Sequence, residues 1–231
     1  MILSDELVTN RIEAVCVGPH VTDQWLDAFV DRCLPRVRYL TGIAVNLHQA
    51  GQVAGRLKES GIDVIVEIAF PLGNIPTEAK LVQLRDAIDA GATQADIVMQ
   101  VESLREGQFD RARKEAETLV AAADDKLDTI AFIPNLGYLS DEQKTAAARI
   151  ISDVGAALKT DTGVNLTTSI ADVSGLRESF GDALPIHAGN CSTAEDAIAL
   201  VRSGADRVAS DDPFAIFQGI ATLFEFQGKE M

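Results

Sequence analysis

Two ionisable side chains interrupt apolar stretches of this sequence, at positions where burying a charge is costly. Lys159 follows the apolar residues 156–158. Burial disfavours the charged form of an ammonium group, so we expect the pKa of Lys159 to be lowered. A lysine that is partly neutral near pH 7 attacks carbonyl carbons and forms an imine, which lets a neighbouring carbon–carbon bond break or form. The alternative is a lysine whose aliphatic stem packs on apolar surface while its ammonium group reaches solvent.

The second such side chain is Asp96, which lies within the stretch 95–99. A buried carboxylate needs a partner. If Lys159 lies across the same interior, the pair combines an ion pair with a proton shuttle for the carbonyl and hydroxyl groups of an aldol. Alternatively, Asp96 caps a helix or is paired at the floor of the fold.

Short strands that alternate with helices have to position these groups. Glycines end several helical patterns at sites that favour a left-handed residue before the next strand, namely Gly61, Gly91, Gly155 and Gly204. Eight such units in 231 residues predict one α/β domain over residues 1–231, a (βα)8 TIM barrel with a parallel eight-stranded core. The predicted strands are 12–17, 43–47, 64–70, 96–100, 129–133, 157–160, 184–188 and 207–210. A doubly wound sheet is the alternative, but no G-x-G-x-x-G motif follows the first strand.

In a barrel of this kind the chemistry lies at the C-terminal ends of the strands. The polar residues at those ends are candidates for the site, and they are His20, Asn46, His48, Gln100, Asp161, His187, Ser210, Asp211 and Asp212. The two adjacent aspartates have an alternative role, because an aspartate before Pro213 is also a good helix start.

All three histidines, His20, His48 and His187, fall at predicted strand ends on one face. With an aspartate they would form a ligand set for Zn²⁺. Their spacing matches no local ligand motif, so we expect no metal and no cofactor. A divalent-metal enzyme remains an alternative, which chelator sensitivity would distinguish.

Composition narrows the class of partner. Apolar residues make up 47% and charged residues 24% of the chain, and no apolar run is long enough to span a bilayer. The formal net charge of −15 opposes binding to nucleic acid or to an anionic membrane, so we expect small-molecule substrates and protein partners, including further copies of this chain. Three widely spaced cysteines and the lack of a secretory signal in MILSDELVTNR predict reduced thiols in a cytoplasmic protein.

Motifs along essentially the whole chain resemble the deoxyribose-phosphate aldolase family. They are FPLGN at 70–74, the helix with Lys80, GATQADIVMQ at 91–100, KTDTG at 159–163, HAG at 187–189 with TAEDA at 193–197, and GADRVAS before the last helix. The resemblance implies that Lys159 forms an imine with the donor and that Asp96 assists proton transfer. It also adds Thr162 and Gly189 to the candidate substrate contacts.

Departures from the family pattern concern charge. The second lysine of the family, on strand seven, is replaced by His187, which titrates near neutral pH and is expected to act as acid or base beside the imine. At the family's phosphate site, this chain has Asp211 and Asp212 after Ser210, Asp161 within KTDTG, and Val164 where some members carry a lysine. These carboxylates would repel a phosphate dianion.

We therefore expect a metal-independent class I aldolase, or a related carbon–carbon lyase, that acts through Lys159 on a neutral or cationic carbonyl substrate without a phosphate group. One alternative is imine chemistry without C–C cleavage, such as dehydration or a Mannich-type condensation. Another is a barrel that only binds a ligand, which the missing strand-seven lysine would favour.

Overall fold

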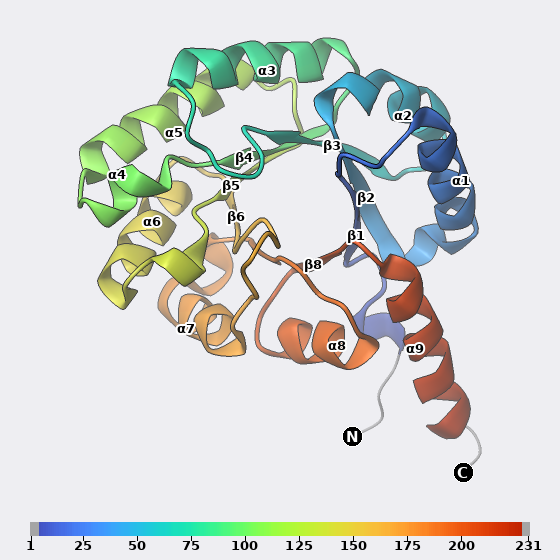
Figure 1. The fold of residues 1–231 in the computed structure, drawn as a ribbon. Coiled ribbons are helices and arrows are strands. Elements are labelled where there is room, and N and C mark those ends of the chain that lie inside the picture. Colours follow the sequence, from blue (N-terminus) through green and yellow to red (C-terminus); the bar gives the residue numbers. More distant parts are fainter. Residues whose placement is uncertain (1–4, 228–231) are drawn as a thin grey trace.

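The computed structural model describes residues 5–227, which form a closed barrel of eight parallel strands inside a ring of helices (Figure 1). Each strand pairs with its neighbours in the sequence, and β8 closes the barrel against β1. The predicted (βα)8 TIM barrel is confirmed. Its closure brings the C-terminal ends of all eight strands together at one mouth.

Within the described residues, the strands are β1 (Ile12–Cys16), β2 (Leu40–Val45), β3 (Asp63–Ile68), β4 (Gln94–Val98), β5 (Thr129–Ile133), β6 (Ala157–Lys159), β7 (Ile186–Ala188) and β8 (Arg207–Ser210). The α-helices are α1 (Asp23–Cys33), α2 (Ala50–Leu57), α3 (Thr77–Asp89), α4 (Val101–Arg105), α5 (Phe109–Ala123), α6 (Asp141–Asp153), α7 (Ile170–Phe180), α8 (Ala194–Arg202) and α9 (Pro213–Gln227). Short 3-10 helices occupy Asp5–Leu7, Leu34–Tyr39, Leu47–Gln49, Leu136–Tyr138 and Gly181–Ala183.

All eight predicted strands overlap observed ones, but some boundaries differ. The second strand begins at Leu40 rather than at residue 43, and the fourth begins at Gln94 rather than at Asp96. Gln100 therefore lies after β4, at the start of α4, instead of on the strand. Strand limits depend on which backbone groups find partners on neighbouring strands, and local sequence does not reveal that.

Glycines act at the turns as predicted. Positive φ angles of 71°, 92°, 71° and 111° occur at Gly61, Gly91, Gly155 and Gly204, respectively. Gly73 in the FPLGN motif has a φ of 74°, and a Cβ added there would lie 2.0 Å from the carbonyl oxygen of Met99. The loop after β3 thus packs directly against the end of β4, which only glycine permits.

Polar side chains fill the N-terminal end of the barrel interior. Arg207 donates a hydrogen bond to Gln94 Oε1 at 2.7 Å, and Gln94 in turn donates to Asp63. These residues begin β8, β4 and β3, respectively, so their network forms a polar floor. The opposite faces of the strands carry the apolar core that packs on the helices, with buried residues that include Ile43, Val66, Ile97, Phe132, Leu158 and Val208.

A buried ion pair outside the barrel ties two helices to β4. Lys80 on α3 is 0% exposed, and its Nζ lies 2.8 Å from Glu115 Oε1 on α5. The same ammonium group donates to the carbonyl oxygen of Val98 at 2.6 Å, while Glu115 Oε2 accepts the backbone N–H of Gln100 at 3.2 Å. The pair therefore holds the C-terminal end of β4 in place.

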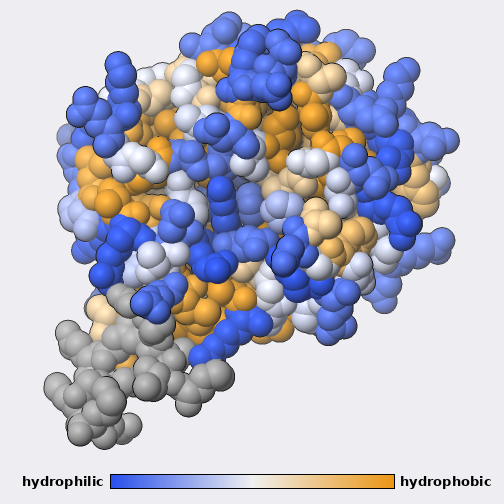
Figure 2. Space-filling view, turned by 180° about the vertical axis from the view of Figure 1, so that it is seen from behind, coloured by the Kyte–Doolittle hydropathy of each residue, from blue (hydrophilic) through white to orange (hydrophobic). Residues whose placement is uncertain are grey.

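The face seen from behind in Figure 2 mixes hydrophilic and hydrophobic residues, with hydrophilic ones running through its middle. No helix within residues 5–227 is long and apolar enough to cross a bilayer. Exposed apolar residues that are scattered among polar ones are ordinary on protein surfaces.

Candidate active site

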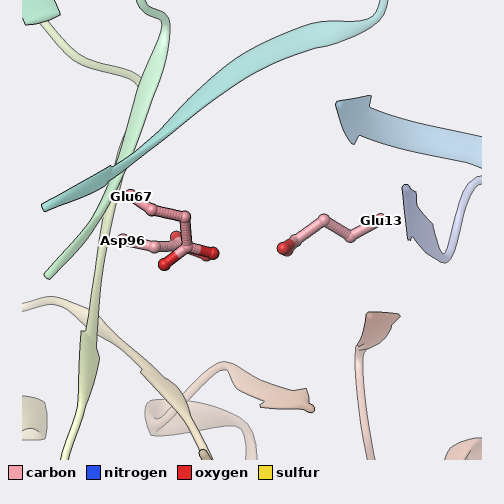
Figure 3. A group of neighbouring side chains, drawn as sticks. All are labelled: Glu13, Glu67 and Asp96. Atoms are coloured by element: carbon pink, nitrogen blue, oxygen red, sulfur yellow. The ribbon is translucent and has the colours of Figure 1, made fainter. Parts of the chain in front are cut away.

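Lys159 is the last residue of β6, and its side chain points into the barrel, where only 3% of it is exposed. Its Nζ donates hydrogen bonds to Glu13 Oε1 at 2.6 Å, Glu67 Oε1 at 2.8 Å and Asp96 Oδ2 at 2.6 Å. The three carboxylates extend from β1, β3 and β4 toward one point (Figure 3). An ammonium group has three protons, so all of its donors are used by this cluster.

The predicted contact between Lys159 and Asp96 is present, but the prediction missed Glu13 and Glu67. Both are lone charged residues in otherwise apolar strands, in IEAVC and DVIVEI. This signal is the same one that singled out Lys159 and Asp96. Glu67 is also the register partner of Asp96 on the adjacent strand, so the two side chains project to the same side of the sheet.

The expected lowering of the Lys159 pKa is wrong for this cluster. Burial alone acts in that direction, but attraction from Asp96, Glu13 and Glu67 outweighs it, and the pKa lies well above its ordinary value. The resting side chain is therefore an ammonium ion. Such a lysine attacks a carbonyl carbon only after it has passed a proton to an acceptor within the site.

The carboxyl groups of Asp96 and Glu67 are shifted toward their neutral forms. Burial raises the pKa of Asp96 well above its usual value, and attraction to Lys159 offsets this only in part. Burial also raises the pKa of Glu67, and repulsion from Glu13 adds to the shift. Within residues 5–227, Glu13 Oε2 and Glu67 Oε2 are buried without a hydrogen-bond partner. Three carboxylates around one ammonium ion thus form a site that can take up and release protons.

His187 is the register partner of Lys159 on β7 and is 3% exposed. Its pKa is well below the ordinary value because of burial and the nearby charges of Arg207 and Lys159, so the ring is neutral. Its Nδ1 finds no hydrogen-bond partner in the part of the chain that the structure describes. The ring lines a cavity near Arg207 and Thr129, at the N-terminal end of the barrel, rather than the cavity that contains Lys159. The groups nearest the amine are therefore carboxylates, not this imidazole as expected.

A cavity of ≈ 120 Å³ opens above Lys159 at the mouth of the barrel. Its lining residues are Val15, Val17, Glu67, Phe70, Lys159, Asp161, Thr162, Gly163, Val164, Gly189, Asn190, Ala209, Ser210 and Asp211. Five of the predicted substrate contacts are among them: Asp161, Thr162, Gly189, Ser210 and Asp211. Cavities of ≈ 330 and ≈ 520 Å³ adjoin it and share Val164 in their linings.

Asp161 organises the loops at this mouth. Its Oδ2 accepts hydrogen bonds from the hydroxyls of Thr160 and Thr168, and its Oδ1 accepts the backbone N–H of Gly163. Added to Gly189, a Cβ would lie 2.6 Å from the Asp161 carbonyl oxygen, so the loops after β6 and β7 are in close contact. Asp161 is therefore held by protein donors while it lines the cavity.

The two aspartates after β8 have different surroundings. Asp212 accepts the backbone N–H of Ala215 at 3.2 Å, so it caps α9, as the alternative prediction proposed. Ser210 Oγ accepts the backbone N–H of Asp212 and fixes this turn. Asp211 is exposed and lines the cavity above Lys159. Of these two aspartates, Asp211 is thus the one positioned to contact a substrate.

The remaining predicted contacts lie farther from Lys159. His20 is exposed, with its ring centroid 5.8 Å from that of Trp25. Asn46 and His48 line the adjoining cavity of ≈ 520 Å³ rather than the one with Lys159. Gln100 donates to the carbonyl oxygen of Ile75 at 3.0 Å and supports the loop after β3, lining none of these mouth cavities.

The three histidines do not form a metal centre. In the part of the chain that the structure describes, the group with suitable ligand spacing is Glu13, Glu67 and Asp96, whose ligand atoms lie within 4.8 Å of one another. The Lys159 ammonium group bonds to all three and occupies the position of a cation. The alternative of a histidine metal site is therefore wrong, because His187 is inside the barrel whereas His20 and His48 are exposed.

Comparisons with known proteins agree with this geometry. The chain is 32% identical over 212 residues to the deoxyribose-phosphate aldolase of Staphylococcus haemolyticus, covering 90% of this chain and 94% of that protein. It is 28% identical over 217 residues to the deoxyribose-phosphate aldolase of Thermococcus gammatolerans, with coverage of 92% and 96%. No family model matches the chain.

Among solved structures, the deoxyribose phosphate aldolase from Aeropyrum pernix, described as tetrameric, superposes with a TM-score of 0.85. The identity is 22%, and the match covers 94% of this chain and 92% of that one. This likeness establishes the fold.

Proposed function

The chain belongs to the deoxyribose-phosphate aldolase family and is a class I aldolase, and from this premise we propose that its substrate is a neutral or cationic carbonyl compound without a phosphate group. The observation that carries this proposal is the charge of the cavity above Lys159. Asp161, Asp211 and Glu67 line it, and within the described residues Lys159 is its one cationic side chain. Lys159 is itself surrounded by carboxylates, so it offers a phosphate dianion little attraction.

Backbone amides at the mouth support the same proposal. Phosphate sites in proteins commonly use free backbone N–H groups of glycine-rich turns. Here the N–H of Gly163 donates to Asp161, that of Gly189 to Thr160 Oγ1 and that of Thr162 to Asn135 Oδ1. A phosphate group would have to compete with these bonds.

We assign the nucleophile to Lys159 and proton transfer to its carboxylate partners, of which Asp96 is one. The small cavity directly above Nζ accommodates a donor of a few carbon atoms, and Val15, Val17 and Ala209 give it apolar walls. The adjoining cavities leave room for a longer acceptor. Thr162, Gly189, Ser210 and Asp211 are the proposed polar contacts of the substrate. We assign no proton transfer to His187, whose ring lines the cavity at the other end of the barrel.

Borohydride trapping tests the proposal. The protein is mixed with small carbonyl probes (acetaldehyde, propanal and acetone), reduced with sodium borohydride and mapped by mass spectrometry. We expect a stable adduct on Lys159, because reduction converts an imine into a secondary amine. If no probe leaves an adduct while the protein still cleaves or forms aldols, catalysis through Lys159 is refuted.

The substrate charge is tested with Asp211→Ser, which removes one carboxylate without disturbing the cap of α9. Removing one like charge near a phosphate is worth about 1 to 4 kcal/mol, so we expect kcat/KM for glyceraldehyde 3-phosphate as acceptor to rise at least about fivefold relative to glyceraldehyde. The control is Asp86→Ser, which removes the same charge from the exposed surface of α3. An equal effect of both variants would refute the electrostatic account.

We also propose that this protein forms a homo-oligomer, because the deoxyribose phosphate aldolase from Aeropyrum pernix, which has the same fold, is tetrameric.

A further inference from the structure

We propose that Glu67 is a catalytic residue that accepts a proton from the Lys159 ammonium group and delivers it to the carbonyl oxygen of the substrate. The inference rests on the imine chemistry proposed above. It adds a residue that neither the prediction from sequence nor the family comparison identified.

Glu67 touches both partners of such a transfer. Its Oε1 lies 2.8 Å from Lys159 Nζ. Its Oε2 is buried and has no hydrogen-bond partner among the described residues. Of the three carboxylates around the ammonium group, only Glu67 also lines the cavity in which the substrate carbonyl must lie, whereas Glu13 and Asp96 are absent from that lining. One oxygen is therefore bound to the amine, and the same side chain borders the cavity that a substrate would enter.

The charges that face Glu67 favour this role. They are the Lys159 ammonium group on β6, the Glu13 carboxylate on β1 and the Asp96 carboxyl group on β4, its register partner. Burial raises the pKa of Asp96 well above its usual value, and Asp96 does not line the cavity, so a proton that it took from the amine would have no direct path to the substrate carbonyl. The ammonium group at 2.8 Å favours the carboxylate form of Glu67, and proton transfer between the two needs no movement of heavy atoms.

Glu67 alone can carry out every proton transfer that imine formation requires. The ammonium group gives one proton to Glu67, and the neutral amine then forms the N–C bond while the carbonyl electron pair moves to oxygen. Glu67 returns its proton to that oxygen, which yields a hydroxyl group on a carbon that now bears a protonated amine. Glu67 next removes a proton from this nitrogen and gives it to the hydroxyl group, which leaves as water as the C=N bond forms. The products are the protonated imine, water and the original carboxylate.

Glu67→Gln tests the inference, because the amide keeps the size of the side chain but cannot carry the proton. Imine formation is measured in the full-length protein as the rate of borohydride-trapped adduct with acetaldehyde, from pH 5.5 to 9.5. Removing a proton-transfer group costs about 10²- to 10⁴-fold, so we expect a fall of at least 10²-fold at pH 7. Without Glu67 no carboxylate that lines the cavity can carry the proton from the ammonium group to the carbonyl oxygen, so the proton must pass to solvent and the rate in the variant should rise about tenfold per pH unit. The wild-type profile should be much flatter.

Glu13→Gln is the matched control, since it removes a carboxylate from the same ammonium group but not from the cavity lining. We expect a smaller fall and no change in the slope of its pH profile. Glu67→Asp keeps a carboxyl group, and it should restore a flat profile at reduced rate even if the glutamine variant folds poorly. Far-ultraviolet circular dichroism and the Tm check folding.

Two results distinguish failure of this inference from failure of the proposed function. If Glu67→Gln traps acetaldehyde within threefold of the wild-type rate with an unchanged pH profile, Glu67 is not the proton carrier, although Lys159 still forms the imine. If the wild-type protein forms no adduct on Lys159 with any carbonyl probe, the imine mechanism itself is wrong and the role of Glu67 is overturned with it.

Discussion

Replacing Lys159 with methionine is expected to lower kcat/KM for aldol cleavage by about 10⁴-fold or more, because no other group can take over an imine-forming nucleophile. Methionine keeps the length and apolar stem of the side chain. Activity is measured with the best aldol substrate found for the wild-type protein, and the adduct is followed in parallel. Lys114→Met, on the exposed surface of α5, is the control and should retain wild-type activity. A Lys159→Met protein that keeps more than a few per cent of the activity would exclude Lys159 as nucleophile.

The same variant should also be unstable, and in a pH-dependent way. Breaking a buried ion pair by removing one partner costs about 3–5 kcal/mol, and here three buried carboxylates lose the cation that they share. In the wild-type protein the raised pKa of Lys159 stabilises the fold at every pH below the unfolded value near 10.4, so this contribution is complete from pH 5 to 8.

In Lys159→Met, Asp96 and Glu67 lose the attraction that lowers their pKa values, so these pKa values rise further and the folded state binds more protons than the unfolded state. Its free energy of unfolding should therefore fall as the pH rises from 5 to 8. Urea denaturation at both pH values measures this change. If Lys159→Met lowers the free energy of unfolding equally at pH 5 and pH 8, the protonation of the carboxyl groups does not depend on the ammonium group.

The second large effect is expected at Lys80, the buried lysine that takes no part in the chemistry. Lys80→Met leaves the Glu115 carboxylate buried without its partner, and we expect the free energy of unfolding to fall by about 3–5 kcal/mol. Desolvation lowers the pKa of Lys80 although Glu115 opposes the shift, which indicates how costly this position is for a charge. Urea denaturation gives the loss, and Lys114→Met again serves as the surface control.

A double variant separates the lost contact from the stranded charge. Adding Glu115→Gln to Lys80→Met removes the unpaired carboxylate but keeps an acceptor for the backbone N–H of Gln100. We expect the double variant to be more stable than Lys80→Met alone, because neighbouring substitutions in one network are not additive. If Glu115→Gln lowers the free energy of unfolding of the Lys80→Met protein as much as it lowers that of the wild-type protein, the stranded charge is not the main cost.

Much of this protein was predictable from local sequence. The barrel followed from short strands separated by glycine-terminated helices, and Gly61, Gly91, Gly155 and Gly204 do adopt positive φ angles. Lys159 and Asp96 were found because a charge in a buried strand is costly and so indicates a partner. The same rule, applied to every strand, would also have selected Glu13 and Glu67.

Tertiary structure alone decided how these charges act on one another. Lys159 meets Glu13 across 146 residues of sequence and Glu67 across 92, and only barrel closure and strand register bring them within hydrogen-bond distance. Sequence predicted burial of the amine, and burial by itself lowers a lysine pKa. The sign of the shift is reversed by three carboxylates at 2.6–2.8 Å, because Coulomb energy depends on distances that no local pattern encodes. For the same reason the sequence predicted Lys159 as the nucleophile but not Glu67, the group that we propose takes its proton.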